Sequence, residues 1–144
     1  MDKMINDFVI IDDDSCHNIV CALSLKKAFN PINFNIVGFT NVAEGITYLE
    51  KKISTKDSMT VLFLDINMPD MSGWDVLNRI SKLSDAMKNN LIVYMLSASV
   101  SMVDKAKAFM FPFVKDCLEK PLSDHLIYIS EELNEKALIK KIYA

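Results

Sequence analysis

The chain has 144 residues, 51% of them hydrophobic and 24% charged, which is typical of one globular domain and excludes an extended disordered protein. Its net charge of −3 argues against nucleic acid as the main partner, since phosphate backbones attract clustered lysine and arginine. The amino terminus is too polar for a signal peptide and no apolar run is long enough to cross a membrane, so we expect a cytoplasmic protein with no membrane partner.

The first predicted element is a buried strand that ends in acids. Phe8–Ile11 is an apolar run, and all three residues at positions 12–14 are aspartate. The last of these, or Ser15, can cap a helix that runs to about Phe29. The residues of this helix that we expect to face the core are Ile19, Val20 and Leu23.

The second strand is predicted to lie at an edge of the sheet. Ile32–Phe39 begins with alternating apolar and polar residues, which indicates a strand buried on one face only. Asn41 can cap the next helix, and Ser54–Thr60 is predicted to be a polar loop. The apolar residues of this helix recur at i, i+4, i+7 and i+11, namely Val42, Ile46, Leu49 and Ile53.

The third strand, Val61–Leu64, is a continuous apolar run that predicts burial on both faces. It ends on a carboxylate, Asp65, and a loop with Pro69 and Gly73 leads into a helix from Trp74. The apolar residues expected on one face of that helix are Val76, Ile80, Leu83 and Met87.

Two more strands complete the pattern. Leu91–Leu96 is another buried run and ends on Ser97, and a short helix is predicted at about Ser101–Phe109. The last strand, about Phe113–Leu118, is closed by Glu119, Lys120 and Pro121. Ser123 or Asp124 can start the final helix, whose inward face is predicted to consist of Leu122, Leu126, Ile129 and Leu133.

Five strands that alternate with five helices predict an α/β fold, a doubly wound parallel sheet covered on both faces. Right-handed crossovers and the edge character of the second strand favour the flavodoxin-like order 2-1-3-4-5. We expect residues 1–144 to form one domain of this kind.

Polar residues follow four of the predicted strands, and their carboxyl ends meet at one edge of such a sheet. These residues are Asp12, Asp13, Asp65, Ser97 and Lys120. Crowded carboxylates repel one another unless a cation neutralises them, and oxygen ligands suit Mg²⁺. Together with a hydroxyl and an ammonium group, they form a set that can hold a phosphoryl group next to a carboxylate nucleophile.

Four motifs, in this order along the chain, carry a resemblance to a known family. They are Ile11-Asp12-Asp13-Asp14, Leu64-Asp65-Ile66-Asn67-Met68-Pro69 with Gly73, Leu96-Ser97-Ala98, and Glu119-Lys120-Pro121. With these motifs the chain resembles the receiver domain of two-component response regulators, in particular the single-domain, CheY-like kind. The motifs span nearly the whole sequence.

The resemblance implies a role for each matching residue. Asp65 would accept a phosphoryl group from the phosphohistidine of a histidine kinase or of a histidine phosphotransfer protein. Asp13, Asp65 and the carbonyl of Asn67 would bind Mg²⁺ directly, with Asp12 acting through water. Ser97 would be the switch hydroxyl, and Lys120, followed by a cis bond to Pro121, would pair with a phosphoryl oxygen.

The resemblance also implies protein partners. With no output domain expected, the signal would pass to a downstream protein through the fourth helix, fifth strand and fifth helix, about Ser101–Ala144. One position departs from the family, because Cys117 stands where Tyr or Phe is usual. We expect the cysteines to be free buried thiols and both histidines, His17 and His125, to lie on the surface.

Two other functions fit parts of the pattern. A haloacid-dehalogenase-type phosphatase also uses a strand-end aspartate, Mg²⁺, a hydroxyl and a lysine, and Asp12 would then be its nucleophile. The short chain, the lack of a visible cap domain and the lack of an acidic motif after Lys120 argue against it. The second alternative is a receiver-like domain that only binds other proteins and is not phosphorylated. Such a domain has no reason to keep all five site residues, namely Asp12, Asp13, Asp65, Ser97 and Lys120.

Overall fold

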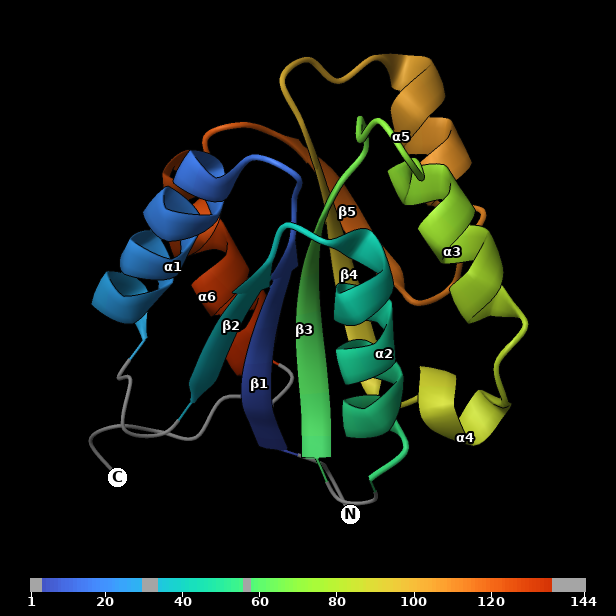
Figure 1. The fold of residues 1–144 in the computed structure, drawn as a ribbon. Helices are drawn as coiled ribbons and strands as arrows, with labels where there is room; N and C mark the ends of the chain where they lie inside the picture. The colour runs from blue at the N-terminus through green and yellow to red at the C-terminus, as the bar shows by residue number, and fades with distance from the viewer. Residues whose placement is uncertain (1–3, 30–33, 56–57, 136–144) are drawn as a thin grey trace.

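A five-stranded parallel sheet with the order β2-β1-β3-β4-β5 forms the centre of the computed structural model, which describes residues 4–29, 34–55 and 58–135 (Figure 1). Its strands are β1 (Met4–Ile11), β2 (Asn35–Phe39), β3 (Ser58–Asp65), β4 (Leu91–Ser97) and β5 (Val114–Glu119). The helices are α1 (Ser15–Ala28), α2 (Val42–Ile53), α3 (Gly73–Ser81), α4 (Asp85–Lys88), α5 (Met102–Ala108), the 3-10 turn η1 (Leu122–His125) and α6 (Leu126–Glu135).

Helices cover both faces of the sheet, so two separate cores form. On one face α1 and α6 pack through Cys21, Leu25 and Ile129. On the other face α2, α3 and α5 pack through residues that include Ile46, Val76 and Ala108 (Figure 1). The predicted fold class and strand order are therefore confirmed, and β2 lies at the edge as its alternating residues indicated.

The described part of the chain contains six α-helices where five were predicted, because the third predicted helix is split. Lys82 ends α3, and its N–H donates to the carbonyl oxygens of Arg79 and Ile80. The hydroxyl of Ser84 then accepts the N–H of Met87 at 3.2 Å and caps the short helix α4. The apolar spacing from Val76 to Met87 did not reveal this interruption.

Two strands, β1 and β3, begin before the apolar runs that predicted them. β3 begins at Ser58, inside the segment predicted to be a polar loop, because Ser58 and Met59 pair with Met4 and Ile5 of β1. Pairing with a neighbour thus extends a strand beyond the residues whose composition predicts it. For β2, the predicted start at Ile32 lies outside the described residues, and the strand is described from Asn35.

The predicted inner face of α1 is wrong. Ile19, Val20 and Leu23 are 61%, 52% and 54% exposed, whereas Asn18, Cys21 and Leu25 are the buried residues of this helix. The side chain of Asn18 donates to the carbonyl oxygen of Asp12 at 2.7 Å and that of Phe39 at 3.3 Å. These bonds join α1 to the ends of β1 and β2, which favours the observed rotation of the helix about its axis.

No described helix has the length and apolar character that crossing a bilayer requires.

Candidate functional site

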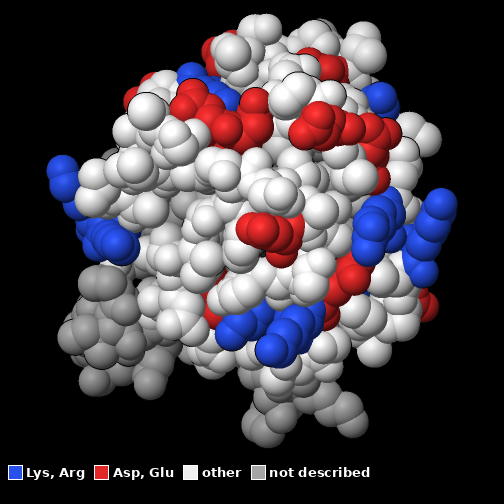
Figure 2. Space-filling view, viewed as in Figure 1, with Lys and Arg blue, Asp and Glu red and all other residues white. Residues whose placement is uncertain are grey.

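The carboxyl ends of the strands bring the predicted polar residues to one edge of the sheet. Asp65 and Ser97 are the last residues of β3 and β4, and Asp12 directly follows β1. Lys120 directly follows β5, and its backbone N–H donates to the carbonyl oxygen of Ser97 at 2.8 Å. In the space-filling view, acidic side chains gather along the edge where β1 and β3 end (Figure 2).

Three acids meet at this edge. Asp12, Asp13 and Asp65 each offer an oxygen, and these oxygens all lie within 4.8 Å of one another. Asp12 and Asp65 are buried, whereas Asp13 is exposed. The structure therefore brings together the three carboxylates that the sequence predicted.

Lys120 lies between two of these acids. Its Nζ is 3.1 Å from Oδ2 of Asp12 and 3.2 Å from Oδ1 of Asp65. Burial by itself lowers the pKa of Lys120, but the hydrogen bond and charge of Asp12, together with Asp65, leave that pKa raised overall. Lys120 is thus held in its charged form, and its bond to Pro121 is cis, as the resemblance implied.

The pKa of Asp65 is raised. Burial is the largest cause, and the charge of Asp12 adds to it, while Lys120 acts in the opposite direction. Lys120 therefore does not offset the combined effect of burial and of Asp12 on this carboxyl group. The site favours an additional positive charge.

The loop after β3 approaches the acids closely. Gly73 donates its N–H to the carbonyl oxygen of Ile66 at 2.8 Å, and a Cβ at position 73 would lie 2.5 Å from the carbonyl oxygen of Asp65. Further along the rim, Nδ2 of Asn67 donates to Oγ of Ser97 at 3.4 Å, and Ser97 is buried. All the predicted site residues therefore lie along one edge.

The donor set fits a hard divalent cation. The clustered ligand atoms are carboxylate oxygens, which Mg²⁺ prefers. Burial, and after it the charge of Asp12, raises the pKa of Asp65, and a bound cation would favour the ionised carboxylate. Asp13 is exposed, so hydrating waters can remain on an ion held there.

His17 contacts the site, although we expected it on the surface. Its side chain is only 15% exposed, and Nδ1 lies 2.5 Å from Oδ2 of Asp12. The sulfur of Cys21, one helical turn later, is 3.5 Å from Nε2 of the same ring. The spacing of His17 and Cys21 indicates one helix face, but nothing in the sequence shows that this face meets Asp12. His125 is partly exposed, and its Nε2 lies 2.6 Å from the carbonyl oxygen of Glu119.

The cysteines differ in exposure. Cys21 and Cys117 are buried and free, as predicted. Cys16 is also free, but it is exposed, so the prediction that it is buried is wrong. Burial raises the pKa of Cys117 to about 11, so it remains a neutral thiol packed in the core between the sheet and α5.

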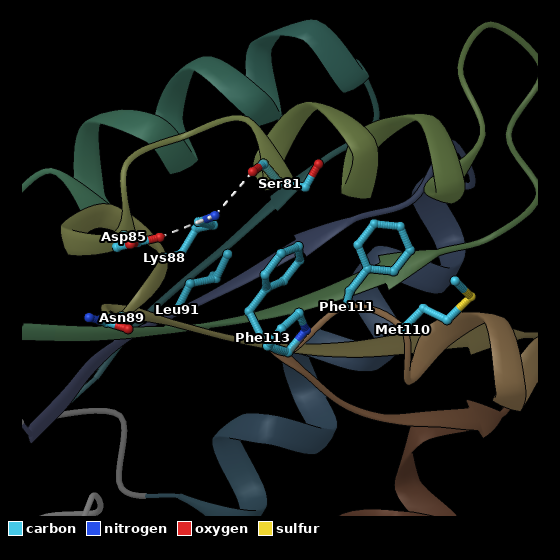
Figure 3. Close-up of a pocket in the computed structure, with 9 residues that line it drawn as sticks. Ser81, Asp85, Lys88, Asn89, Leu91, Met110, Phe111 and Phe113 are labelled. Carbon is cyan, nitrogen blue, oxygen red and sulfur yellow. Dashed lines mark hydrogen bonds and ion pairs between the residues drawn. The ribbon is translucent and has the colours of Figure 1, made fainter.

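Two surface cavities lie at opposite edges of the sheet. One of about 540 Å³ borders Asp13 and is also lined by Thr40, Asn41 and Pro69. The other, of about 470 Å³, is lined by Lys88, Leu91 and Phe113 at the amino-terminal ends of β4 and β5 (Figure 3). Only the first adjoins the acids.

Comparisons with known proteins agree with this architecture. A family model for the response regulator receiver domain matches residues 8–130. A two-component response regulator from Cytophaga hutchinsonii is 25% identical with a TM-score of 0.78, covering 92% of this chain and 99% of that chain. A receiver protein from Dyadobacter fermentans, 23% identical with a TM-score of 0.76 over 91% and 97% of the two chains, shows the same fold. No curated protein matches the chain.

Proposed function

Since the chain belongs to the response regulator receiver family, a family of signalling domains, we propose that it is a phosphorylation-controlled switch whose phosphoacceptor is Asp65. The observation that carries this proposal is the position of Lys120, which contacts both Asp65 and Asp12 within a cluster of three acids. A buried strand-end carboxylate beside a charged ammonium group suits phosphoryl transfer to that carboxylate.

The proposed transfer uses Asp65 as the nucleophile. One of its carboxylate oxygens forms the new P–O bond while the P–N bond to the donor histidine breaks, and the bonding electron pair leaves on the imidazole nitrogen. Lys120, 3.2 Å from Asp65, pairs with an oxygen of the transferred group. The hydroxyl of Ser97 donates a hydrogen bond to another.

Mg²⁺, held by Asp13, Asp65 and the carbonyl of Asn67 with Asp12 acting through water, would supply positive charge for the phosphoryl oxygens. The close approach of three carboxylates supports such an ion. Asp13 is the exposed member of the acids, so an ion can reach the site from solvent at that point.

The phosphodonor is proposed to be a histidine kinase or a histidine phosphotransfer protein, and α1 supports a docking surface for it. α1 starts three residues after Asp12, and its side chains Ile19, Val20 and Leu23 are exposed although they are apolar. A patch of this kind beside a site suits contact with another protein.

The downstream partner is proposed to bind the face formed by α5, β5 and α6. This face carries exposed apolar side chains, namely Met102, Val103, Phe109, Met110, Ile127 and Tyr128. Both β5 and the segment before α5 connect directly to the site, through Lys120 and Ser97. The part of the predicted face beyond residue 135 lies outside the described residues.

Intact mass after incubation with phosphoramidate and Mg²⁺ tests the proposal. We expect wild type to gain one labile phosphoryl group, Asp65→Asn to gain none, and the matched control Asp70→Asn, an exposed acid of the same loop, to behave as wild type. A haloacid-dehalogenase-type phosphatase would instead lose its covalent intermediate in Asp12→Asn and keep it in Asp65→Asn. That result, or no adduct on wild type, would overturn the proposal.

A further inference from the structure

Three donors converge on the carboxylate of Asp12. The backbone N–H of Asp14 donates to Oδ1 at 2.9 Å, and Nζ of Lys120 donates to Oδ2 at 3.1 Å. Nδ1 of His17 lies 2.5 Å from the same Oδ2. Asp12 itself is 1% exposed, so protein groups rather than bulk water satisfy this carboxylate.

The number of donors limits how Asp12 can meet an ion. A carboxylate oxygen has about two lone pairs, and His17 and Lys120 use both of those on Oδ2. Asp14 uses one of those on Oδ1. Asp12 therefore has one acceptor position left, on Oδ1. A cation, or a water molecule bound to that cation, can occupy it.

The ring of His17 also packs against Cys21. The sulfur lies 3.5 Å from Nε2 and 3.7 Å from Nδ1, and the residues are four apart on α1. Burial raises the pKa of Cys21 to about 11, so at neutral pH it is a neutral thiol beside the ring. An ionised carboxylate only accepts hydrogen bonds, so the contact between Asp12 and His17 requires an N–H on Nδ1.

We propose that His17 is a positioning residue for the cation site: its Nδ1–H fixes the carboxylate of Asp12 so that Lys120 remains shared between Asp12 and Asp65. This inference rests on the proposed function. Among the described residues, Lys120 is the one side chain left on Oδ2 without His17, and Asp12 can rotate toward it and draw it away from Asp65. Groups that orient the ligands of a metal commonly change its affinity by about 10–100-fold when they are lost.

A pair of substitutions separates hydrogen bonding from packing. His17→Leu removes the donor, whereas His17→Asn keeps an N–H close to the position of Nδ1. We expect His17→Leu to weaken Mg²⁺ binding about tenfold, measured by titration calorimetry, and His17→Asn to stay near wild type. Cys16→Ala, an exposed residue of the same helix, is the matched control and should bind Mg²⁺ as wild type does.

Nitrogen-15 NMR of the histidine rings tests the contact in the wild-type protein, whatever the variants do to folding. We expect a proton on Nδ1 of His17, and the other histidine, His125, provides a reference signal in the same spectrum. An unprotonated Nδ1 would overturn the proposal, and so would equal Mg²⁺ affinities in wild type and His17→Leu, or equal losses in His17→Leu and His17→Asn.

These outcomes differ from failure of the proposed function. If wild type binds Mg²⁺ and is phosphorylated on Asp65 but His17→Leu matches it in both, only the role of His17 is refuted. If wild type takes up no phosphoryl group, the proposed function itself is wrong.

Discussion

Replacing Gly73 with alanine should damage both the fold and the acid site, because the first turn of α3 lies against the end of β3. A Cβ on this residue would lie 2.5 Å from the carbonyl oxygen of Asp65 and 2.9 Å from Cα of Ile66, both of which are backbone atoms. A third contact, 2.9 Å from Cε of Met95, involves a flexible tip that can move. The backbone contacts can be relieved only if the end of β3 or the start of α3 shifts.

The cost of such overpacking is typically about 1–3 kcal/mol, which in a domain of this size corresponds to a fall in melting temperature of about 3–9 °C. Thermal unfolding followed by circular dichroism measures it. Gly45→Ala is the matched control, because its Cβ would lie 2.9 Å from side-chain atoms of Ile11 and its gain in helix propensity of about 1 kcal/mol offsets the contact. A Gly73→Ala variant that melts with wild type, or no lower than Gly45→Ala, would refute the reasoning.

Three further predictions concern the site. Lys120→Gln removes the ammonium group between two acids, so phosphoryl uptake from phosphoramidate should fall about 100-fold, followed by intact mass. Leu23→Asp should slow transfer from a histidine phosphotransfer protein about tenfold yet leave uptake from phosphoramidate unchanged, and equal slowing of both reactions would contradict docking on α1. Burial and Asp12 raise the pKa of Asp65, so protons should compete with Mg²⁺ at a higher pH than they would at an ordinary aspartate. The Mg²⁺ affinity measured by calorimetry should therefore fall as the pH is lowered. An affinity that stays constant until the pH reaches the usual pKa range of aspartate would contradict this.

The sheet could be predicted because its central strands are buried on both faces. Runs such as Val61–Leu64 and Leu91–Leu96 have no charged residue, and a parallel sheet covered by helices buries such runs on both faces. The rotation of α1 could not be predicted in the same way. Its apolar side chains Ile19 and Leu23 are exposed, and a polar residue, Asn18, faces the sheet because it bonds to two strand ends.

The acids and Lys120 could be placed together because each directly follows a strand, and strand order then sets their neighbours. His17 could not, because it lies on a helix and its partner, Asp12, lies in the preceding turn. Whether a residue five positions after Asp12 reaches back to it depends on how α1 leaves that turn. The three-dimensional path of the turn sets this distance, and no periodic pattern reports it.

The place of Cys117 constrains how a signal could leave the site. Cys117 is 0% exposed and packs in the core on the α5 side of the sheet, opposite Met95 in the register of β4 and β5. A thiol there has no ring that could move inward if Ser97 acts as the proposed switch hydroxyl. The backbone connects the site to the proposed partner face at two places. Lys120 directly follows β5, and the segment after Ser97 leads into α5. If Lys120 moves toward a phosphoryl group on Asp65, it loses its contact with Asp12, while His17 keeps its own contact with that carboxylate. The end of β5 would then move together with Lys120. The proposed partner face would then respond through β5 and α5, and His17 would determine how easily Lys120 is released.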